Sequence, residues 1–218
     1  GSIEDMIVEN CTIESNKYPM GLKNINDKPS ILYYNGSIEC INKYKNIAVI
    51  GTRKASENGL KIAYETGAFL AKNNINVVVH IINGLPYETN VVNGLALGCD
   101  TEALRGALDN GGRCIVLLPC GLDNIQPKSN RSLADRIVQN GGCLISEYNV
   151  GTPLNKYQYV KRDRLQSGIC QGVLVVEAEM NSGTMHTVKY AEEQFKRIAC
   201  YSHRLVKFSS GNEYLEQN

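Results

Sequence analysis

The sequence has little net charge, no long apolar run and no visible export signal. Its 218 residues carry 23 Lys and Arg against 22 Asp and Glu, a formal charge of +1. Any nucleic acid must therefore bind to a local basic patch, because the molecule as a whole supplies no attractive field. No apolar run is long enough to cross a bilayer and no secretory leader is visible, so we expect no membrane partner. Gly1-Ser2 is interpreted as a remnant of recombinant expression.

The eight cysteines lack the spacing of zinc ligands or of a redox pair. The closest two, Cys114 and Cys120, have five residues between them. Cys114, Cys143 and Cys200 fall within apolar runs, where a reduced thiol behaves as a small hydrophobic group. We therefore expect structural thiols, no metal site and a reducing, cytoplasmic location.

Two familiar nucleotide signatures are also missing. No Gly-rich loop is followed by Lys and Ser or Thr, as a P-loop requires, and no three-glycine dinucleotide fingerprint follows the first strand. The expected second strand ends at His80, where a ribose-binding acid would stand. These absences disfavour a P-loop NTPase and an NAD-dependent dehydrogenase, and we expect no cofactor.

Short apolar runs alternate regularly with amphipathic segments after residue 45. The runs are mostly continuous Val, Ile and Leu, which is typical of strands covered on both faces. Gly111-Gly112 and Gly141-Gly142 are predicted helix stops, and Asp100 is a predicted helix N-cap. The predicted strands are residues 47–50, 75–79, 114–118, 143–146, 173–177 and 198–201. This alternation predicts an α/β fold, a Rossmann-like, doubly wound, mostly parallel sheet with helices on both faces and a short N-terminal extension.

The alternation divides the chain into three parts. Residues 3–44 are predicted to form an N-terminal extension that packs on the core, with an edge strand at Ile31–Tyr34. Residues 45–203 form the Rossmann core. Residues 204–218 form a C-terminal tail, either a short helix or a loose segment.

One stretch of the core repeats itself. Residues 81–85 are echoed at 91–95, either through a short duplication or through coincidence in a sequence rich in Val, Ile and Gly. Between the two copies, Pro86–Asn90 makes an extra excursion before the next helix.

Glycine, hydroxyl and basic residues gather where the predicted strands end. In an open parallel sheet, ligands bind outside the carboxyl ends of the strands, at the switch point. Glycine lets the backbone approach closely, helix N-termini offer free N–H groups, and Arg53 can fork onto a phosphate. Each loop alone is explained as simply by a turn or a cap, so the prediction depends on their coincidence at one edge. The candidate binding residues are Gly51, Thr52, Arg53, Lys54, Ser56, Asn93, Gly94, Leu95, Gly98, Asp100, Gly121, Ser182, Gly183 and Thr184.

Six motifs occur in the order found in the DprA/Smf family of DNA-processing proteins. They are GTRKAS (51–56), GLALGCDTEALRGAL (94–108), PCGLDNIQP (119–127), SEYNVGTP (146–153), VKRDRLQSG (160–168) and VVEAEMNSGT (175–184). Together with a similar lead-in at 18–36, the resemblance covers roughly residues 17–203. It implies a homodimeric Rossmann-like core that binds single-stranded DNA and hands it to a RecA-type recombinase, without catalysis. It also implies a wider LOG/SLOG superfamily, whose crevice binds small nucleotide-derived ligands.

The segment from Lys156 to Arg164 carries chemistry that suits DNA. Cations alternate there with tyrosines, a composition that can neutralise phosphates while stacking bases. The residues alone favour a solvated helix face with core-facing tyrosines, whereas the resemblance favours phosphate contact. Lys161, Arg162 and Arg164 therefore join the candidate binding residues.

Three departures from the family pattern favour a smaller ligand. Asp163 stands where the family usually has Asn, and a carboxylate there opposes a polyanion. The sequence holds neither the helical domain that commonly precedes the core nor the winged-helix-like domain that follows it. The Pro86–Asn90 excursion is expected beside the crevice, as a lid. The alternative function is therefore a sensor or sequestering protein for a small nucleotide signal, such as a cyclic nucleotide or an ADP-ribose derivative.

An enzyme of the related LOG type, a nucleoside-monophosphate phosphoribohydrolase, is disfavoured. That family has a catalytic Glu soon after its Gly-rich loop, whereas Ser182-Gly183-Thr184 is followed by Met185-His186. The carboxylates near the sheet edge are explained more simply as helix caps and strand-end hydrogen-bond acceptors. We therefore expect no catalytic residue.

Overall fold

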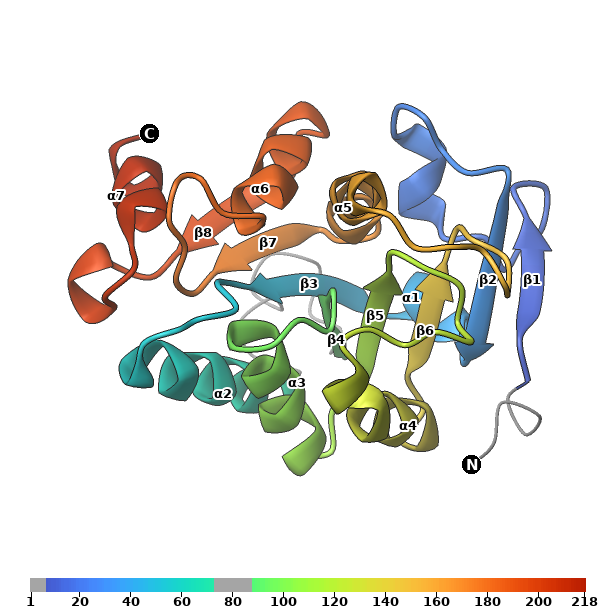
Figure 1. Cartoon of the computed structure of the whole chain (residues 1–218), viewed down its shortest axis with the longest axis horizontal. Helices are drawn as coiled ribbons and strands as arrows, with labels where there is room; N and C mark the ends of the chain where they lie inside the picture. The colour runs from blue at the N-terminus through green and yellow to red at the C-terminus, as the bar shows by residue number, and fades with distance from the viewer. Residues whose placement is uncertain (1–6, 73–87) are drawn as a thin grey trace.

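The computed structural model describes residues 7–72 and 88–218, which are organised around one eight-stranded sheet (Figure 1). The strands are β1 (Glu9–Thr12), β2 (Ile31–Gly36), β3 (Lys45–Ile50), β4 (Thr89–Asn93), β5 (Cys114–Leu118), β6 (Cys143–Ser146), β7 (Gly172–Val175) and β8 (Arg197–Cys200). Their spatial order is β1-β2-β6-β5-β4-β3-β7-β8. The six strands from β6 to β8 are parallel, and β1 and β2 continue the sheet antiparallel. The predicted Rossmann-like, mostly parallel sheet is confirmed.

The sheet reverses its winding between β3 and β7. From β3 the chain adds β4, β5 and β6 on one side, and it then returns to add β7 and β8 on the other. All six parallel strands end at the same edge, so the loops that follow them meet there. This edge carries most of the residues predicted to bind a ligand.

Helices cover both faces of the sheet. In Figure 1, α2, α3 and α4 lie below it and α5 and α6 lie above it. Two buried apolar clusters result, one on each face. The helices are α1 (Glu39–Lys43), α2 (Glu57–Lys72), α3 (Cys99–Asp109), α4 (Arg131–Gln139), α5 (Lys156–Gly168), α6 (Thr184–Glu193) and α7 (Ser210–Gln217). Short 3₁₀ turns are η2 (Met20–Asn24), η4 (Lys128–Asn130) and η5 (His203–Leu205).

Glycines set the spacing and the ends of the lower helices. A Cβ added to Gly67 of α2 would lie 1.9 Å from the Ala103 carbonyl oxygen, and one added to Gly106 of α3 would lie 2.0 Å from that of Tyr64. The two backbones therefore touch where only glycine fits. The predicted helix stops are also confirmed, because α3 and α4 end just before Gly111 and Gly141, which have φ of 77° and 82°.

The strand between β3 and β5 differs from the prediction. It is Thr89–Asn93, which includes the end of the predicted excursion and part of the second copy of the repeat. The predicted strand at 75–79, the first copy at 81–85 and His80 lie outside the described residues. Because Thr89 and Asn90 begin β4, they lie at the amino end of the sheet. Asn90 donates hydrogen bonds there to the Cys40 carbonyl and to Asn46 Oδ1, both at 2.9 Å. The prediction that this stretch lies beside the crevice is wrong for its described residues.

The two ends of the chain pack on opposite parts of the sheet, and only the N-terminal end is more regular than predicted. The predicted edge strand pairs with β6 on its inner side, and the edge itself is β1, which pattern analysis missed. At the other end, the tail forms η5 and α7, so the short helix is the predicted alternative that the structure supports. Asn212 of α7 is fully buried, accepts from the Ala178 amide and donates to the carbonyls of Val176 and Tyr201. The tail is therefore docked on the strand ends.

The cysteines are free thiols that lie mostly in the core. All eight cysteines are free, and seven of them are buried. Burial raises the pKa of the Cys40 thiol to about 11, and that of Cys120 to the same value, so both remain protonated near neutral pH. Within residues 7–72 and 88–218, no helix is long and apolar enough to span a bilayer.

Candidate phosphate-binding site

The loop after β3 presents two cations on a backbone that the neighbouring loops hold in place. Gly51 is buried, and a Cβ there would lie 2.5 Å from Cys99 Sγ. The Thr52 amide donates to the Glu177 carbonyl at 2.7 Å, and the Thr52 carbonyl accepts from the Cys99 amide at 3.2 Å. Arg53 and Lys54, between these fixed points and α2, are exposed.

The carboxylate of Glu177 closes the other end of this loop. Its side chain follows β7 and is fully buried. Oε1 accepts from the Ser56 amide at 2.9 Å and from the Ser56 hydroxyl at 3.1 Å. The Ser56 hydroxyl also accepts from the Gly59 amide, so it caps the start of α2. Ser56 thus fixes the loop, and its hydroxyl is occupied by protein groups.

The loop after β4 is held from below by buried polar groups. Asn93 donates to the carbonyls of Val49 and Asp100, both at 3.1 Å, and its Oδ1 accepts from the Leu95 amide. Asp100 Oδ2 accepts from the amides of Gly94 and Ala96. The prediction that Asp100 caps α3 is wrong, because Gly98 occupies the N-cap and Asp100 bonds back to the loop.

Asp100 is a buried acid. Burial raises its pKa to about 7, against the Arg162 charge and the backbone amides of Ala96 and Gly94, which lower it. Asn93, Leu95 and Asp100 therefore shape the loop from beneath rather than presenting groups to a ligand. Gly98, with φ of 80°, packs against the Thr52 carbonyl and brings the two loops together.

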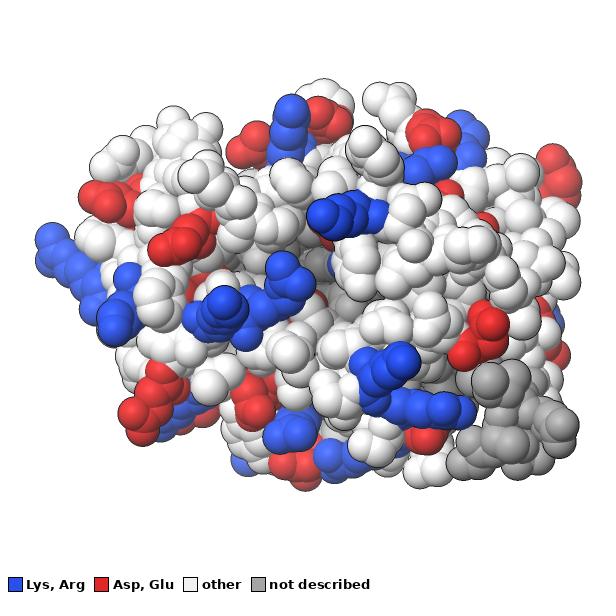
Figure 2. Space-filling view, in the orientation of Figure 1, with Lys and Arg blue, Asp and Glu red and all other residues white. Residues whose placement is uncertain are grey.

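A surface pocket of about 410 Å³ opens where these two loops meet the helices below the sheet. Predicted residues Arg53, Lys54 and Gly98 line it. Figure 2 shows Lys and Arg side chains gathered over the loop after β3. The other lining residues are Ala55, Leu60, Leu97, Thr101, Glu102, Arg105, Ser129 and Asn130. The pocket thus lies on the β3–β4 side of the switch point, between α2, α3 and η4.

The pocket lining from α3 and η4 was missed by the sequence reasoning. Arg105 lies one turn beyond the predicted loop and forms an exposed ion pair with Glu102 at 3.4 Å. Asn130 donates to the Leu95 carbonyl and to Thr101 Oγ1, both at 2.9 Å, and so joins η4 to the loop after β4. A signal was present, because the motif at 119–127 ends three residues before Asn130.

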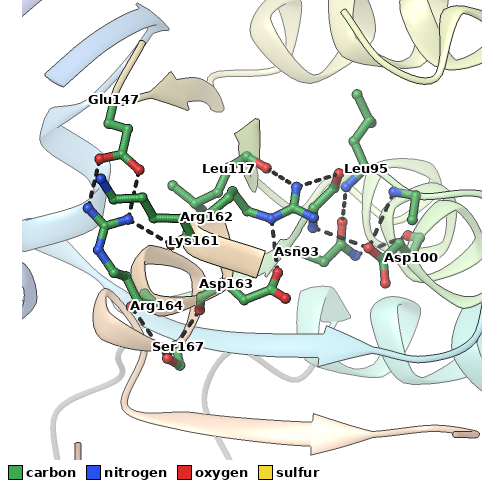
Figure 3. A network of polar contacts seen from close by, with 12 residues as sticks. Asn93, Leu95, Asp100, Leu117, Glu147, Lys161, Arg162, Asp163, Arg164 and Ser167 are labelled. Carbon is green, nitrogen blue, oxygen red and sulfur yellow. Dashed lines mark hydrogen bonds and ion pairs between the residues drawn. The ribbon is translucent and has the colours of Figure 1, made fainter. Parts of the chain in front are cut away.

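The arginines of α5 form a buried network rather than a surface patch (Figure 3). Arg162 is 8% exposed and donates to the carbonyls of Leu117, at 2.7 Å, and Gly94, at 3.3 Å. Its Nε donates to Asp163 Oδ1 at 3.0 Å. Asp163 is itself buried, so the expectation that its carboxylate faces a polyanion is wrong. Arg162 contacts the loop after β4 through its hydrogen bond to the Gly94 carbonyl, while its own side chain stays buried.

Arg164 is paired inside the protein. Its two terminal nitrogens donate to the two carboxylate oxygens of Glu147, each at 2.7 Å, and Nε donates to the Asp27 carbonyl. Burial alone would lower the pKa of this guanidinium, but the hydrogen bonds and charge of Glu147 outweigh it and raise the pKa. The geometry leaves Arg164 out of the exposed surface.

Only the first half of α5 is open to a ligand. Tyr157 is 86% exposed, and Lys156 is also exposed. The Lys161 side chain is 48% exposed and lies 3.9 Å from the carboxylate of Asp27. These three residues keep the alternation of cation and aromatic noted in the sequence, whereas the arginines that follow turn inward.

The remaining predicted residues lie outside the pocket lining. Gly121 is buried, and a Cβ there would lie 2.7 Å from the Asn149 carbonyl oxygen. Ser182 donates to the Glu179 carbonyl at 2.6 Å, and Gly183 and Thr184 begin α6 on the upper face of the sheet. Their role in binding stays a prediction. No group of three His, Cys, Asp or Glu side chains suited to a metal occurs among the residues described.

The chain resembles known proteins over most of its length. The chain is 37% identical over 181 residues to DNA processing protein DprA of Streptococcus pneumoniae, covering 83% of this chain and 58% of that protein. It spans about half the length of the curated relatives it matches.

Two solved structures share its fold. The X-ray structure of S. pneumoniae DprA superposes with a TM-score of 0.82 at 32% identity, covering 99% of this chain and 70% of that one. DNA processing protein A of Helicobacter pylori, described for its single-stranded DNA binding mode, gives 0.80 at 28% identity, covering 96% and 88%. The family profile described as DNA recombination-mediator protein A matches residues 9–218. The chain therefore belongs to the DNA recombination-mediator protein A family.

Proposed function

We propose that this chain binds single-stranded DNA at the pocket between α2, α3 and η4. The observation that carries the proposal is the loop after β3, whose backbone is held by hydrogen bonds and whose exposed Arg53 and Lys54 line that pocket. Supporting it, the H. pylori relative of the same fold is described as binding single-stranded DNA. The matched proteins are described by DNA processing and recombination mediation, not by a reaction. We propose binding without catalysis.

The groups at the site suit a nucleotide chain. Arg53 can fork onto a phosphate, and Lys54 supplies a second point charge. Outside the pocket lining, on α5, Tyr157 offers an exposed aromatic face, and Lys156 and Lys161 offer two cations for another part of the strand. Delivery of the strand to a RecA-type recombinase, and a homodimer formed through the core, belong to the same proposal and rest on family membership alone.

A small nucleotide is the second candidate for the same pocket. Its volume of about 410 Å³ falls within the range of small-molecule sites. The lid that favoured this alternative in the sequence finds no support in the described residues, since Thr89 and Asn90 lie at the opposite end of the sheet. We therefore rank single-stranded DNA first.

The experiment is a binding titration of a fluorescent oligothymidylate against the chain and its Arg53→Ala/Lys54→Ala variant. The variant should bind at least tenfold more weakly, and its affinity should depend less on salt, with a slope smaller by about 1.4 for two lost phosphate contacts at ~0.7 each. A Lys23→Ala/Lys189→Ala variant is the matched control, because it removes the same charge from exposed sites on η2 and α6.

Two outcomes would contradict the proposal. Equal losses in both variants would mean that binding follows overall charge rather than this loop. A melting temperature raised by a mononucleotide or cyclic nucleotide, with no oligonucleotide binding, would favour the small ligand instead.

A further inference from the structure

The segment after β8 carries exposed cations that no part of the proposed site uses. It comprises residues 202–208 and is called here the basic segment. Arg204 and Lys207 are exposed within it, whereas His203 is held by Glu216 of α7. The Lys207 ammonium lies 5.5 Å from the centre of the Phe208 ring, so the segment also pairs a cation with an aromatic side chain.

The basic segment lies beside the loop after β3 because both are bonded to one carboxylate. Glu177 Oε1 accepts from Ser56, as described above. Glu177 Oε2 accepts from the amides of Lys207 at 2.9 Å and Phe208 at 2.8 Å. A buried carboxylate with four donors fixes its partners relative to one another. Lys207 is thereby held close to Ser56, two residues beyond Lys54.

A second contact joins the basic segment to the start of α2. Asn58 Nδ2 donates to the Leu205 carbonyl, which places η5 against the first turn of that helix. Asn212 secures the same segment from the other side, since it bonds to the Tyr201 carbonyl just before it. The position of Arg204 and Lys207 relative to the binding loop is therefore set by the fold.

The charges of these two segments add up to one basic surface. Figure 2 shows a row of Lys and Arg side chains that runs from the left edge of this face, over η5, to the loop after β3. The exposed cations of these segments are Arg53, Lys54, Arg204 and Lys207. None of them forms an ion pair with any other residue in the described part of the chain, and Glu57 is the one carboxylate between Gly51 and Asn58.

We propose that the basic segment is a second phosphate-binding stretch, over which a single strand continues after it leaves the pocket. The inference rests on the proposed function and extends it. The ligand is the sugar–phosphate backbone of the same strand. Exposed cations in a row bind a polyanion without reading sequence, so this stretch adds affinity and salt dependence but no base preference.

The test compares oligothymidylates of about 4 and about 16 nucleotides, the range of site sizes of single-strand-binding folds. Arg204→Ala/Lys207→Ala should weaken binding of the longer strand about tenfold at low salt and reduce its salt slope by about 1.4, the value for two phosphate contacts. Binding of the shorter strand should stay within a factor of two. Lys23→Ala/Lys189→Ala serves again as the charge-matched control.

Failure of this inference is distinct from failure of the proposed function. If Arg53→Ala/Lys54→Ala weakens both strands while Arg204→Ala/Lys207→Ala changes neither, the pocket stands and the basic segment does not. Equal weakening of both strands by Arg204→Ala/Lys207→Ala would also overturn the second stretch, because its contribution must depend on strand length. If the unaltered chain binds neither strand, both proposals fall together.

Discussion

Two pairs of basic residues near the same edge of the sheet differ in their exposure to solvent. Arg53 and Lys54 stand exposed on a short loop whose backbone is fixed by Glu177 and Cys99. Arg162 and Arg164, on α5, are 8% and 4% exposed and bonded to carbonyls and carboxylates of the protein. The sequence presents both as basic residues in a motif. The difference teaches that a charge is available to a ligand only where the fold has not already supplied its partner.

The largest effect that tests this comparison is the loss of stability in Arg164→Ala. The substitution leaves the Glu147 carboxylate, whose side chain is 9% exposed, without its bidentate partner. Removing one member of a buried pair costs about 3–5 kcal/mol, because the other charge stays buried. Urea unfolding followed by circular dichroism should show this loss.

Arg53→Ala is the counterpart on the exposed side. It should change the free energy of unfolding by no more than about 0.5 kcal/mol, as surface substitutions usually do. The contrast between buried and exposed arginines is wrong if Arg164→Ala leaves the free energy of unfolding unchanged. It is also wrong if Arg53→Ala lowers that free energy as much as Arg164→Ala does.

A second prediction concerns the acids that surround Arg162. Burial raises the pKa of Asp100 from 3.8 to about 7. Between these values the folded chain holds a proton that the unfolded chain releases, so this group's contribution to stability is full below about pH 4 and is lost as pH rises through 7. The slope is at most about 1.4 kcal/mol per pH unit. Burial also raises the pKa of Asp163, with the same sign.

The measurement is urea unfolding of the chain and of Asp100→Asn across this pH range. The difference in unfolding free energy, unaltered chain minus variant, should fall as pH rises. A difference that is constant, or that rises with pH, would show that Asp100 is ionised throughout and that Arg162 dominates its environment.

Much of the fold follows from local patterns, and the exceptions have physical causes. Continuous apolar runs identified β3, β5, β6 and β7, because strands covered on both faces need apolar residues on both sides. A shorter run identified β8, which lies at the edge of the sheet and is only partly buried. Strand β4 contains Asn90 and Asn93, whose side chains are fully buried and bonded to backbone carbonyls. A strand of this kind is not recognised from runs of apolar residues, because its buried polar groups find their hydrogen-bond partners only in the folded structure.

The site divides in the same way. The pocket-lining residues Arg53, Lys54 and Gly98 were among the predicted residues because loops after parallel strands converge at one edge. Arg105 and Asn130 were missed because they reach the pocket from a helix turn and a 3₁₀ turn, whose placement depends on packing. Arg164 was assigned to the surface because no pattern in the sequence shows that Glu147, seventeen residues earlier, would take its charge.

The smallest expected effect is on DNA affinity, and it tests whether burial decides the influence of a charge more than its position in the sequence motif. Asp163→Asn should change affinity for single-stranded DNA by less than about twofold, since the Asp163 side chain is buried and Arg162 Nε takes its carboxylate. Glu102→Gln is the matched substitution in the pocket lining, where it removes one carboxylate and releases Arg105. That variant should bind severalfold more tightly, with a salt slope steeper by up to ~0.7. Binding titrations at two salt concentrations measure both variants. If Asp163→Asn gains as much as Glu102→Gln, the charge of Asp163 is felt by the strand, and the separation between a buried and an exposed set of charges fails.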